Sequence, residues 1–590
     1  MQRIDAHPPL APLADPSQAR RSKELLAGGV SSAEALRAQH ALSFTGAHFI
    51  SRRRIPGDLA KWLDPKLSHL TPPDGMADRE AAADRIARAI RAKERVAIFG
   101  DYDCDGITSA AIMTGLVRAL GGEAVPLLAT RTEGAYGLSD KALARIQASG
   151  ATLLVTCDCG SSDHERIAAA KRAGIDAVVI DHHLVPKDPL PALAFLNPHR
   201  PECRFPYKHL ASCGLALSMG AALRKTLGRE LDLRPFLDLV AIGTVADVAP
   251  LVGDNRALVA AGLRVLSAGV RPGLRALADL AKMDLSAGIT SEDIAYRIAP
   301  RINAPGRLGD PDDALALLLT RDPTTAMGLA ATVEHVQQQR RLVQSQMVDE
   351  AMADVAEMGL GALSGIVVAR QGWHPGVVGI VAGKIAEAVQ KPVIVIGLEG
   401  ATGRGSVRGP QGFPLYDALD LCRAELVQFG GHQAAAGVHV RSDRLDALRA
   451  AWHAACQRLG EAFVPSAGAE VLTLDPRDDV GHVLRDLARF EPFGEGNPMP
   501  LVRLESTLVK ASRNLKGHLK LELEHASGPL SGIAFSMGEA AGACEGKVLS
   551  ITGALRRNTF QGGVEIQVRS TEPALVPAVA GPDAVPSSSS

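Results

Sequence analysis

The chain lacks the features that mark membrane proteins and secreted proteins. No apolar run reaches the length of a membrane span. Residues 1–16 contain aspartate and several prolines but no apolar signal core, so we expect no secretion signal. Only eight cysteines occur among 590 residues, and they lack the spacing of a disulfide framework. These absences predict a protein of the reducing cytoplasm with no membrane attachment.

The chain also lacks an excess of charge of either sign. Its 64 Lys and Arg nearly balance its 65 Asp and Glu, giving a net charge of −1 and a pI near 7.0. Any nucleic-acid binding would therefore rest on local basic patches. An apolar fraction of 46% and a mean hydropathy of +0.07 are ordinary for a globular protein. The length predicts roughly four domains.

Three short apolar runs each end in aspartate. Residues 96–100 precede an Asp-x-Asp-x-Asp motif, residues 153–157 precede an Asp-Cys-Gly motif, and residues 177–180 precede an Asp-His-His motif. Short β-branched runs separated by helical stretches predict a βαβ arrangement with a mostly parallel sheet. The carboxyl ends of such strands meet at one edge, where carboxylates repel one another unless cations lie among them. The pattern therefore predicts a two-metal hydrolytic site.

The donor atoms at this edge indicate which cation it takes. A further carboxylate, Asp247, follows a fourth apolar run. Carboxylates with imidazole favour Mn²⁺ or Mg²⁺, and two such ions can bind a phosphate and deprotonate a water molecule. An EF-hand loop is disfavoured because Ile112 stands where that loop needs glutamate. A zinc site needs four convergent ligands, so we interpret Cys157 and Cys159 as core residues.

Composition and spacing divide the chain into segments. The predicted fold class is α/β, with two α/β lobes joined by a long helix and a C-terminal β-barrel. In the helix, Asp322 is the expected N-cap and Pro323 the first residue, and the apolar spacing is interrupted at Arg340 and Arg341. The expected segments are an extension packed on the core (1–75), the first α/β domain (76–310), the connecting helix (311–359), the second α/β domain (360–462), the barrel (470–572) and a disordered tail (573–590).

The order of these motifs resembles that of the DHH phosphoesterase superfamily. The resemblance implies a set of metal ligands: Asp103, Asp105, Asp158, His182 and Asp247. It also implies that His183 contacts the substrate phosphate and that Asp181 orients the histidine pair. Some relatives carry a histidine ligand where this chain has Phe99, so Asp101 either compensates as a ligand or supports the loop.

Other segments narrow the resemblance. Residues 403–409 and 429–432 look like the DHH-associated domain, which holds substrate. Residues 243–248, 301–308, 372–376 and 491–498 look like motifs of the RecJ family of single-strand-specific 5′→3′ DNA exonucleases, and the likeness runs from about residue 45 to 572. One small departure is Pro305, where relatives more often carry a small residue. A P-loop is excluded because the Gly379…Gly383-Lys384 spacing is one residue short.

The family resemblance assigns roles to residues outside the acidic edge. Arg131, Ser406 and Arg408 would hold a terminal 5′-phosphate, unless the arginines form ordinary surface ion pairs. Arg307, with Asn303, would stabilise charge at the scissile phosphate. His432 is either a substrate contact or a capping or core histidine.

The barrel would be an OB-fold, a frequent platform for single strands. Its aromatic residues are few, chiefly Phe535 and Phe560, so we expect charge to contribute more than stacking. A solvated barrel face is the alternative reading of its basic side chains. These are Lys510, Arg513, Lys516, Lys520, Arg556 and Arg557.

The expected function is hydrolysis of single-stranded DNA from the 5′ end, releasing 5′-mononucleotides, in DNA recombination and repair. Strand selectivity would be steric, with no sequence selectivity, and a helicase and a single-strand-binding protein are implied partners. A phosphodiesterase for short oligonucleotides or cyclic dinucleotides is a rival, but it needs no added barrel. A binding scaffold with a dead site is another, and the complete ligand set argues against it.

Overall fold

The computed structural model describes residues 33–53, 55, 57–133, 136–359, 363–432, 435–461, 463, 470–558 and 562–573. The chain divides into two compact units. One unit comprises Met1–Asp64, Ala469–Phe490 and Met499–Ser590, and the other comprises Pro65–Gly468 and Glu491–Pro498. The tail that we predict to be disordered lies, beyond residue 573, outside the described part of the chain.

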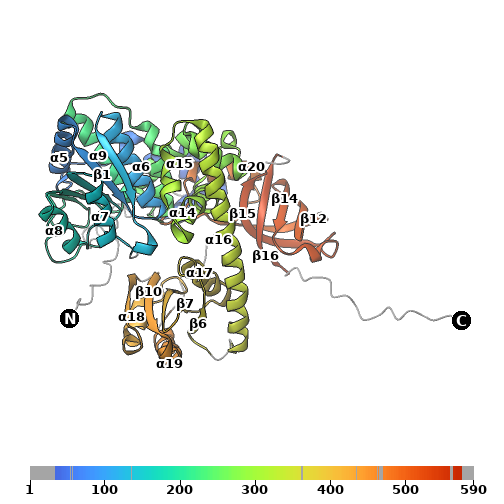
Figure 1. The fold of residues 1–590 in the computed structure, drawn as a ribbon. Coiled ribbons are helices and arrows are strands. Elements are labelled where there is room, and N and C mark those ends of the chain that lie inside the picture. The colour runs from blue at the N-terminus through green and yellow to red at the C-terminus, as the bar shows by residue number, and fades with distance from the viewer. Residues whose placement is uncertain are drawn as a thin grey trace. The chain divides into compact units, whose positions relative to one another are not determined.

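The first lobe is built on a five-stranded parallel sheet with strand order β2-β1-β3-β4-β5 (Figure 1). Side chains alternate between two apolar cores, so Val96 and Ile98 lie in one core and Ala97 and Phe99 in the other. Both faces of the sheet are covered, which is why its strands read as continuous apolar runs. The strands are β1 (Arg95–Gly100), β2 (Glu123–Leu128), β3 (Leu153–Cys157), β4 (Asp176–Ile180) and β5 (Ala194–Leu196).

Helices surround this sheet and complete the first lobe. The apolar run before Asp247 forms helix α10 (Leu237–Ala246), which is buried over most of its length, as expected for a helix apolar on all sides. The remaining long helices are α5 (Arg79–Ala92), α6 (Cys104–Ala119), α7 (Asp140–Ala148), α8 (His164–Arg172), α9 (Ser212–Leu227), α11 (Gly253–Ser267), α12 (Pro272–Leu280), α14 (Ala299–Leu308) and α15 (Asp312–Leu319).

No single helix of the described residues is long and apolar enough to cross a membrane. Helices α11 and α12, bent by 77° relative to each other, reach the length and composition of a span only when they are taken together. Their apolar side chains belong to the main core of the first lobe. All eight cysteines are buried and free of disulfides.

Helix α16 (Pro323–Glu357) connects the two lobes and confirms the predicted long helix. The side chain of Asp322 accepts a hydrogen bond from the Thr325 N–H, and Pro323 occupies the first turn. At 1.5 Å per residue the helix is about 50 Å long. Its first part contributes Ala330 and Val333 to the core of the first lobe, and its last part contributes Met347 to that of the second. Figure 1 shows the helix continuing from one lobe to the other.

The second lobe has a mixed five-stranded sheet of order β6-β7-β8-β10-β9. Strands β6 and β7 are parallel, and the other neighbours are antiparallel. The strands are β6 (Ile366–Gln371), β7 (Val393–Glu399), β8 (Thr402–Arg408), β9 (Gln428–His432) and β10 (Ala435–Arg441), packed with helices α17 (Val378–Val389), α18 (Leu415–Leu421) and α19 (Leu445–Gly460).

The C-terminal strands form a closed five-stranded barrel. Pairing of β12 with β15 closes the order β12-β13-β14-β16-β15, and the short β11 (Val471–Thr473) is parallel to β12. The barrel strands are β12 (Leu501–Leu515), β13 (His518–His525), β14 (Gly528–Ala534), β15 (Val548–Arg557) and β16 (Val564–Glu572). Alternate side chains such as Leu519, Leu521 and Leu523 are buried. The predicted fold class, two α/β lobes on a long helix plus a barrel, is confirmed.

Residues 1–75 are the predicted N-terminal extension packed on the core, and the described part of this segment falls in both units. It belongs to one unit up to Asp64 and to the other from Pro65 onward. In the barrel unit, Ser43 donates to Asp486 at 2.7 Å, and Phe49 of α3 (Phe44–Arg52) stacks on Phe490 of α20 (Val480–Phe490) at 5.1 Å. In the other unit, Thr71 donates to Asp254 at 3.0 Å. The partners lie between 183 and 443 residues away, so the local pattern did not indicate them.

Segment 491–498 is likewise anchored away from its sequence neighbours. It belongs to the unit of the two lobes. The Leu251 N–H donates to the carbonyl of Glu495 at 2.7 Å, and the buried Arg256 guanidinium donates to the carbonyl of Glu491 at 2.9 Å. The segment is therefore held to the first lobe by backbone carbonyls, which explains why a turn-rich sequence is ordered there.

Candidate metal centre

The first two carboxylates of the site are held by helix N-termini. Asp103 is the N-cap of α6 and accepts a hydrogen bond from the Gly106 N–H at 3.0 Å. Asp105, in the first turn of α6, is buried and accepts from the N–H groups of Ser212 at 2.7 Å and Cys213 at 3.0 Å, at the start of α9. Backbone N–H groups and the positive end of the helix macrodipole stabilise a carboxylate at such a position.

Asp158 and Asp247 come from the ends of two further elements. Asp158 directly follows β3 and has a φ of +63°, the left-handed region that non-glycine residues rarely adopt. Strain of this kind is typical of functional sites. Its carboxylate accepts from the Ser212 hydroxyl at 3.1 Å. Asp247 is the C-cap of α10, so its side chain projects from the end of a buried helix.

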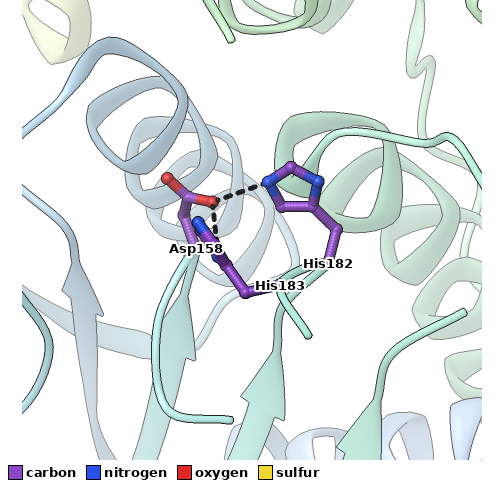
Figure 2. Close-up of side chains that lie close together, drawn as sticks. All are labelled: Asp158, His182 and His183. Carbon is purple, nitrogen blue, oxygen red and sulfur yellow. Dashed lines mark ion pairs between the residues drawn. The ribbon is translucent and has the colours of Figure 1, made fainter. Parts of the chain in front are cut away.

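His182 faces these carboxylates, as Figure 2 shows for Asp158. Its Nε2 lies 3.3 Å from Asp158 Oδ1, 3.7 Å from Asp247 Oδ2 and 4.0 Å from Asp105 Oδ2. This nitrogen is buried and has no hydrogen-bond partner among the described residues. A buried nitrogen without a partner among several carboxylates fits a divalent cation. Two groups of residues have the spacing of metal ligands: Asp105, His182 and Asp247, and Asp158, His182 and His183.

The electrostatics of the site agree with this interpretation. Burial, together with the neighbouring carboxylates, raises the pKa of Asp158 well above its usual range. Burial and the charges of Asp105 and Asp103 raise the pKa of Asp247 to about 8. The protein alone therefore disfavours the charged form of both carboxyl groups, and positive charge is required to keep them ionised at neutral pH.

Asp181 differs from the other aspartates because its partners are supplied by the protein. Its carboxylate accepts from the backbone N–H groups of His182 and Ser161, and it lies 2.8 Å from Nδ1 of His183. Burial opposes ionisation, but the hydrogen bond and charge of His183 hold the pKa of Asp181 well below its usual range. Burial lowers the pKa of His183, yet Asp181 outweighs it and raises that pKa to about 9. These contacts agree with the predicted role of Asp181 in orienting the histidine pair, which stays a prediction.

Asp101 and Asp103 lie near these residues but belong to neither of the two groups that have the spacing of metal ligands. Asp103 is close enough for its charge to raise the pKa of Asp158 and Asp247. Asp101 is buried, and its Oδ1 has no hydrogen-bond partner among the described residues. Their predicted role as ligands stays a prediction. Cys157 and Cys159 are fully buried, which agrees with their interpretation as core residues.

Helix α14 approaches the acidic loop at Gly306 and carries Asn303 and Arg307. Four residues apart, they lie on one face of the helix. A Cβ at Gly306 would lie only 2.4 Å from the carbonyl of Tyr102, so only glycine permits this approach. Arg307 donates to the carbonyl of Gly376 in the second lobe at 3.2 Å. Burial, then the like charges of Arg131 and Arg340, lower the pKa of Arg307 to about 10.

Ser406 and Arg408 meet at the N-terminus of α17. Arg408 donates to the Ser406 hydroxyl at 2.9 Å. A Cβ at Gly379, in the first turn of α17, would lie 3.3 Å from Ser406 Oγ and 3.5 Å from Arg408 Nη2. No side chain caps this helix. A hydroxyl, a guanidinium and a helix N-terminus therefore converge, as in known anion sites. Gly379 is the first glycine of the Gly379…Gly383-Lys384 segment, whose spacing excluded a P-loop.

Arg131 makes its contacts elsewhere. It donates to the carbonyl of Gly306 at 3.0 Å, and its guanidinium lies 4.2 Å from the centre of the Tyr102 ring. Within the described residues, no carboxylate forms an ion pair with Arg131, Arg307 or Arg408. The structure therefore does not favour the alternative in which these arginines form ordinary surface ion pairs. His432 ends β9, and its side chain lies outside the described residues.

The predicted basic residues of the barrel differ in their surroundings. Lys510 pairs with Glu524 at 2.9 Å, and Lys520 pairs with Glu565, so their charges are already compensated. Arg513, Lys516 and Arg557 are exposed, as is Phe535, which lies opposite His518. Arg556 is half-buried in β15. Phe560 lies outside the described residues.

Sequence reasoning missed three residues of the site. Ser212 donates hydrogen bonds to both Asp158 and Asp105. Gly379, which has no side chain, leaves space beside Ser406. The Tyr136 hydroxyl lies 2.9 Å from His183 Nδ1 and donates to the Asp158 carbonyl at 3.1 Å. Ser212 had no motif to mark it. Tyr136 stands in the quoted 131–137 segment, and its rarity, as one of five tyrosines, was the available signal.

Comparison with known families assigns three parts of the chain. Residues 95–244 match the DHH family N-terminal domain, residues 363–458 match the DHHA1 domain, and residues 472–572 match the RecJ OB domain. The three matched ranges follow the order of the first lobe, the second lobe and the barrel.

Individual relatives give the same result. The single-stranded-DNA-specific exonuclease RecJ of Escherichia coli is 34% identical over 544 residues, 86% of this chain and 92% of that protein. The Bacillus subtilis RecJ is also 34% identical, over 85% of this chain, but the match spans only 64% of that longer protein.

Solved structures agree as well. A crystal structure of Thermus thermophilus RecJ in complex with Mn²⁺ has a TM-score of 0.75 at 30% identity and covers 92% of this chain and 77% of that one. The Mg²⁺ complex has a TM-score of 0.70 at 29% identity over 92% and 76%. The predicted cofactors, Mn²⁺ or Mg²⁺, are thus confirmed for the family. The chain belongs to the RecJ family, whose named members are single-stranded-DNA-specific exonucleases.

Proposed function

We propose that this chain is a single-stranded-DNA-specific 5′→3′ exonuclease that releases 5′-mononucleotides and acts in DNA recombination and repair. The observation that supports this most is the buried, unpartnered Nε2 of His182 among Asp105, Asp158 and Asp247. Family membership supplies the substrate class. The cytoplasm is the proposed location, and single-stranded DNA, a helicase and a single-strand-binding protein are the proposed partners.

The proposed chemistry needs two divalent cations, Mn²⁺ or Mg²⁺, which when bound would activate a water molecule and neutralise the phosphate. Asp103, Asp105, Asp158, His182 and Asp247 would hold them. Asp105 and Asp158 are kept in place by Ser212, so the ligands are preorganised before a cation binds.

Other residues of the chain would act on the phosphate directly. His183, held by Asp181 through Nδ1, would direct its Nε2 toward a phosphate oxygen and donate a hydrogen bond to it. Arg307 is half-buried, and its hydrogen bond among the described residues goes to a backbone carbonyl, so other guanidinium N–H groups would serve the negative charge that develops at the scissile phosphate. Asn303, one helical turn earlier, would position the same group.

The direction of digestion would come from the second lobe. Ser406, Arg408 and the N-terminus of α17 offer donors to a terminal phosphate, which carries more negative charge than an internal phosphodiester. Arg131 is the proposed third member of this pocket, and His432 a candidate contact. A bound 5′ end would set which phosphodiester reaches the acidic site, so products would be mononucleotides.

The barrel would add a second binding surface for the single strand. Its exposed cations Arg513, Lys516 and Arg557 suit a phosphate backbone, and Phe535 is 51% exposed and offers one stacking surface. Lys510, Lys520 and Arg556 are weaker candidates within the predicted set, since Lys510 and Lys520 are in ion pairs and Arg556 is half-buried.

The test uses single-stranded DNA labelled separately at each end, with Mn²⁺, Mg²⁺ or EDTA. We expect metal-dependent release of mononucleotides from the 5′ end and no digestion of a blunt duplex. Binding without cleavage under every metal would instead indicate a scaffold. Cleavage confined to very short oligonucleotides would indicate a phosphodiesterase of the kind that acts on small substrates.

A further inference from the structure

The connection between β4 and β5 carries the histidine pair near its start. Residues 181–193 contain no helix or strand, so secondary structure does not fix the backbone of His182 and His183. Connections of this kind are usually mobile surface loops unless other groups hold them. The separation of His182 from Asp158 therefore depends on contacts that reach the histidine pair from outside the connection.

Asn197 makes such a contact from the far end of the connection. The backbone pairing of β4 with β5 ends where the Asp181 N–H donates to the carbonyl of Leu196 at 3.0 Å. The next residue, Asn197, is 1% exposed, and its Nδ2 donates to the His183 carbonyl at 2.8 Å. The side-chain amide thus ties the histidine pair to β5 beyond the last backbone bond.

The same amide reaches the loop that carries Asp158. Nδ2 of Asn197 also donates to the Ser161 hydroxyl at 3.2 Å. Ser161 follows Asp158 in the loop after β3, is 2% exposed, and donates its backbone N–H to Asp181 at 3.1 Å. One buried amide therefore connects two loops of the metal centre, the loop after β3 and the loop after β4.

The oxygen of the amide is used as well. Asn197 Oδ1 accepts from the His199 N–H at 2.8 Å, which is an Asx turn. Donors and acceptor of the side chain all have partners, so the amide cannot turn over without losing hydrogen bonds. Aspartate would form the same turn but its carboxylate donates nothing. The choice of asparagine therefore points to the bonds that its Nδ2 donates.

We infer that Asn197 is a positioning residue of the metal centre, whose amide fixes the His182–His183 turn against the loop of Asp158. Figure 2 shows the side chains that this bridge brings together. The inference rests on the proposed function for the role of these residues. Asn197 would hold them at the separation that a cation requires before one binds, as outer partners of metal ligands do.

A purely structural role makes a different prediction. In that case Asn197 only forms its turn with His199, and replacing it would lower stability without a specific effect on cations. Asn197→Asp distinguishes the two roles above neutral pH, because a carboxylate keeps the volume and the turn but cannot donate to the His183 carbonyl. Its negative charge would attract a cation, so weaker cation binding by this variant could not arise from charge.

The test measures Mn²⁺ binding to the full chain through the electron paramagnetic resonance of free Mn²⁺, with thermal unfolding of the metal-free protein recorded in parallel. For Asn197→Asp and Asn197→Ala we expect roughly tenfold weaker Mn²⁺ binding, the lower end of what loss of an outer partner costs. At saturating Mn²⁺, kcat for 5′-end-labelled DNA should fall by about tenfold. The KM should change little, because the residues proposed to bind the strand are unaltered.

Two further variants serve as controls. Asn497 is 2% exposed and donates its Nδ2 to the carbonyl of Pro492 at 2.8 Å, so Asn497→Ala removes a buried bond of the same kind. It should lower the unfolding temperature but leave the Mn²⁺ affinity unchanged. Ser161→Ala removes only the longer of the two bonds that Asn197 donates and should weaken Mn²⁺ binding less than Asn197→Ala.

The outcomes separate the inference from the proposed function. Unchanged Mn²⁺ affinity in both Asn197 variants would overturn the inference, whatever happens to stability. Weaker binding that follows the unfolded fraction, or that Asn497→Ala shows equally, would overturn it too. A wild-type protein that binds Mn²⁺ but degrades no single-stranded DNA would overturn the proposed function, and the Mn²⁺ titration would still decide the role of Asn197. A wild-type protein that binds no Mn²⁺ would overturn the metal centre and the inference with it.

Discussion

The two lobes use a helix N-terminus in opposite ways. In the first lobe, the N-terminus of α9 is occupied by the protein's own carboxylate, because Ser212 and Cys213 donate to Asp105. In the second lobe, the N-terminus of α17 has no side-chain cap and is bordered by the Ser406 hydroxyl and the Arg408 guanidinium. Backbone donors of the same kind are used internally in the first lobe and, within the proposed function, would serve an external anion in the second.

The difference shows how one architecture can bind ions of both signs. A carboxylate held by N–H groups keeps its remaining lone pairs for a cation, so the filled helix end helps to build a metal site. An uncapped helix end with added donors attracts a phosphate. The acidic edge and the Ser406–Arg408 pocket are thus complementary parts of a site for a metal-bound phosphodiester, within the proposed function.

The strongest test of the filled helix end is Asp105→Ala. We expect activity to fall by more than the roughly 10–100-fold that loss of an outer partner of a metal site typically costs, because Asp105 contacts both the ligand set and α9. The measurement is 5′-end-labelled digestion over a range of Mn²⁺ concentrations. Unchanged turnover would contradict the two-metal assignment.

Metal binding by the same residue can be measured without activity. Saturating Mn²⁺ should stabilise the wild type by about 2.7 kcal/mol at 100 times the dissociation constant, and the shift should largely vanish in Asp105→Ala. Thermal unfolding with and without Mn²⁺ measures it. Asp279→Ala, on the surface of α12, is the control and should keep the shift.

A smaller effect is expected for Asp181→Asn. The amide can still accept hydrogen bonds but loses the charge that pairs with His183, so the histidine pair is less firmly oriented. We expect a roughly 10–100-fold loss of kcat with a modest change in metal affinity. Single-turnover digestion and Mn²⁺ titration separate the two quantities. A pure loss of metal affinity would indicate that Asp181 serves the cations and not His183.

The open helix end is tested by Arg408→Gln. Wild-type protein should prefer 5′-phosphorylated over 5′-hydroxyl ends, and the variant should lose about tenfold of that preference because one charged hydrogen bond is removed. Competition between the two substrates measures the ratio. Lys384→Gln, exposed on the same α17, removes an equal charge and should leave the preference intact. An unchanged preference in Arg408→Gln would remove the pocket from the proposal.

The smallest effects concern charges away from any helix end. Lys516 is exposed, whereas Lys510 already pairs with Glu524. Lys516→Gln should therefore weaken single-strand binding a few-fold and reduce the salt slope by about 0.7, and Lys510→Gln should do less. Salt-dependent binding in EDTA measures both. The reverse order would show that the solvated-face reading of this part of the barrel is the better one.

Much of this protein was determined by its sequence alone. The apolar runs before Asp101, Asp158 and Asp181 predict parallel strands because burial on both faces leaves no polar alternation. Asp322-Pro323 marks the start of α16 because aspartate is a favoured N-cap and proline, which has no N–H group, is favoured at the first helical position. The strand-end aspartates then had to meet at one edge, so the nature of the site followed from local pattern and sheet geometry together.

Tertiary structure decided what depends on distant partners. The division of the N-terminal extension rests on contacts such as Ser43 with Asp486, more than 400 residues apart. Ser212 entered the site only because α9 begins beneath Asp105. Whether a lysine of the barrel is free or paired depends on the strand beside it, as Lys520 and Glu565 show. Local sequence specifies the elements and their charges, but packing determines which charges are already compensated and which remain for a ligand.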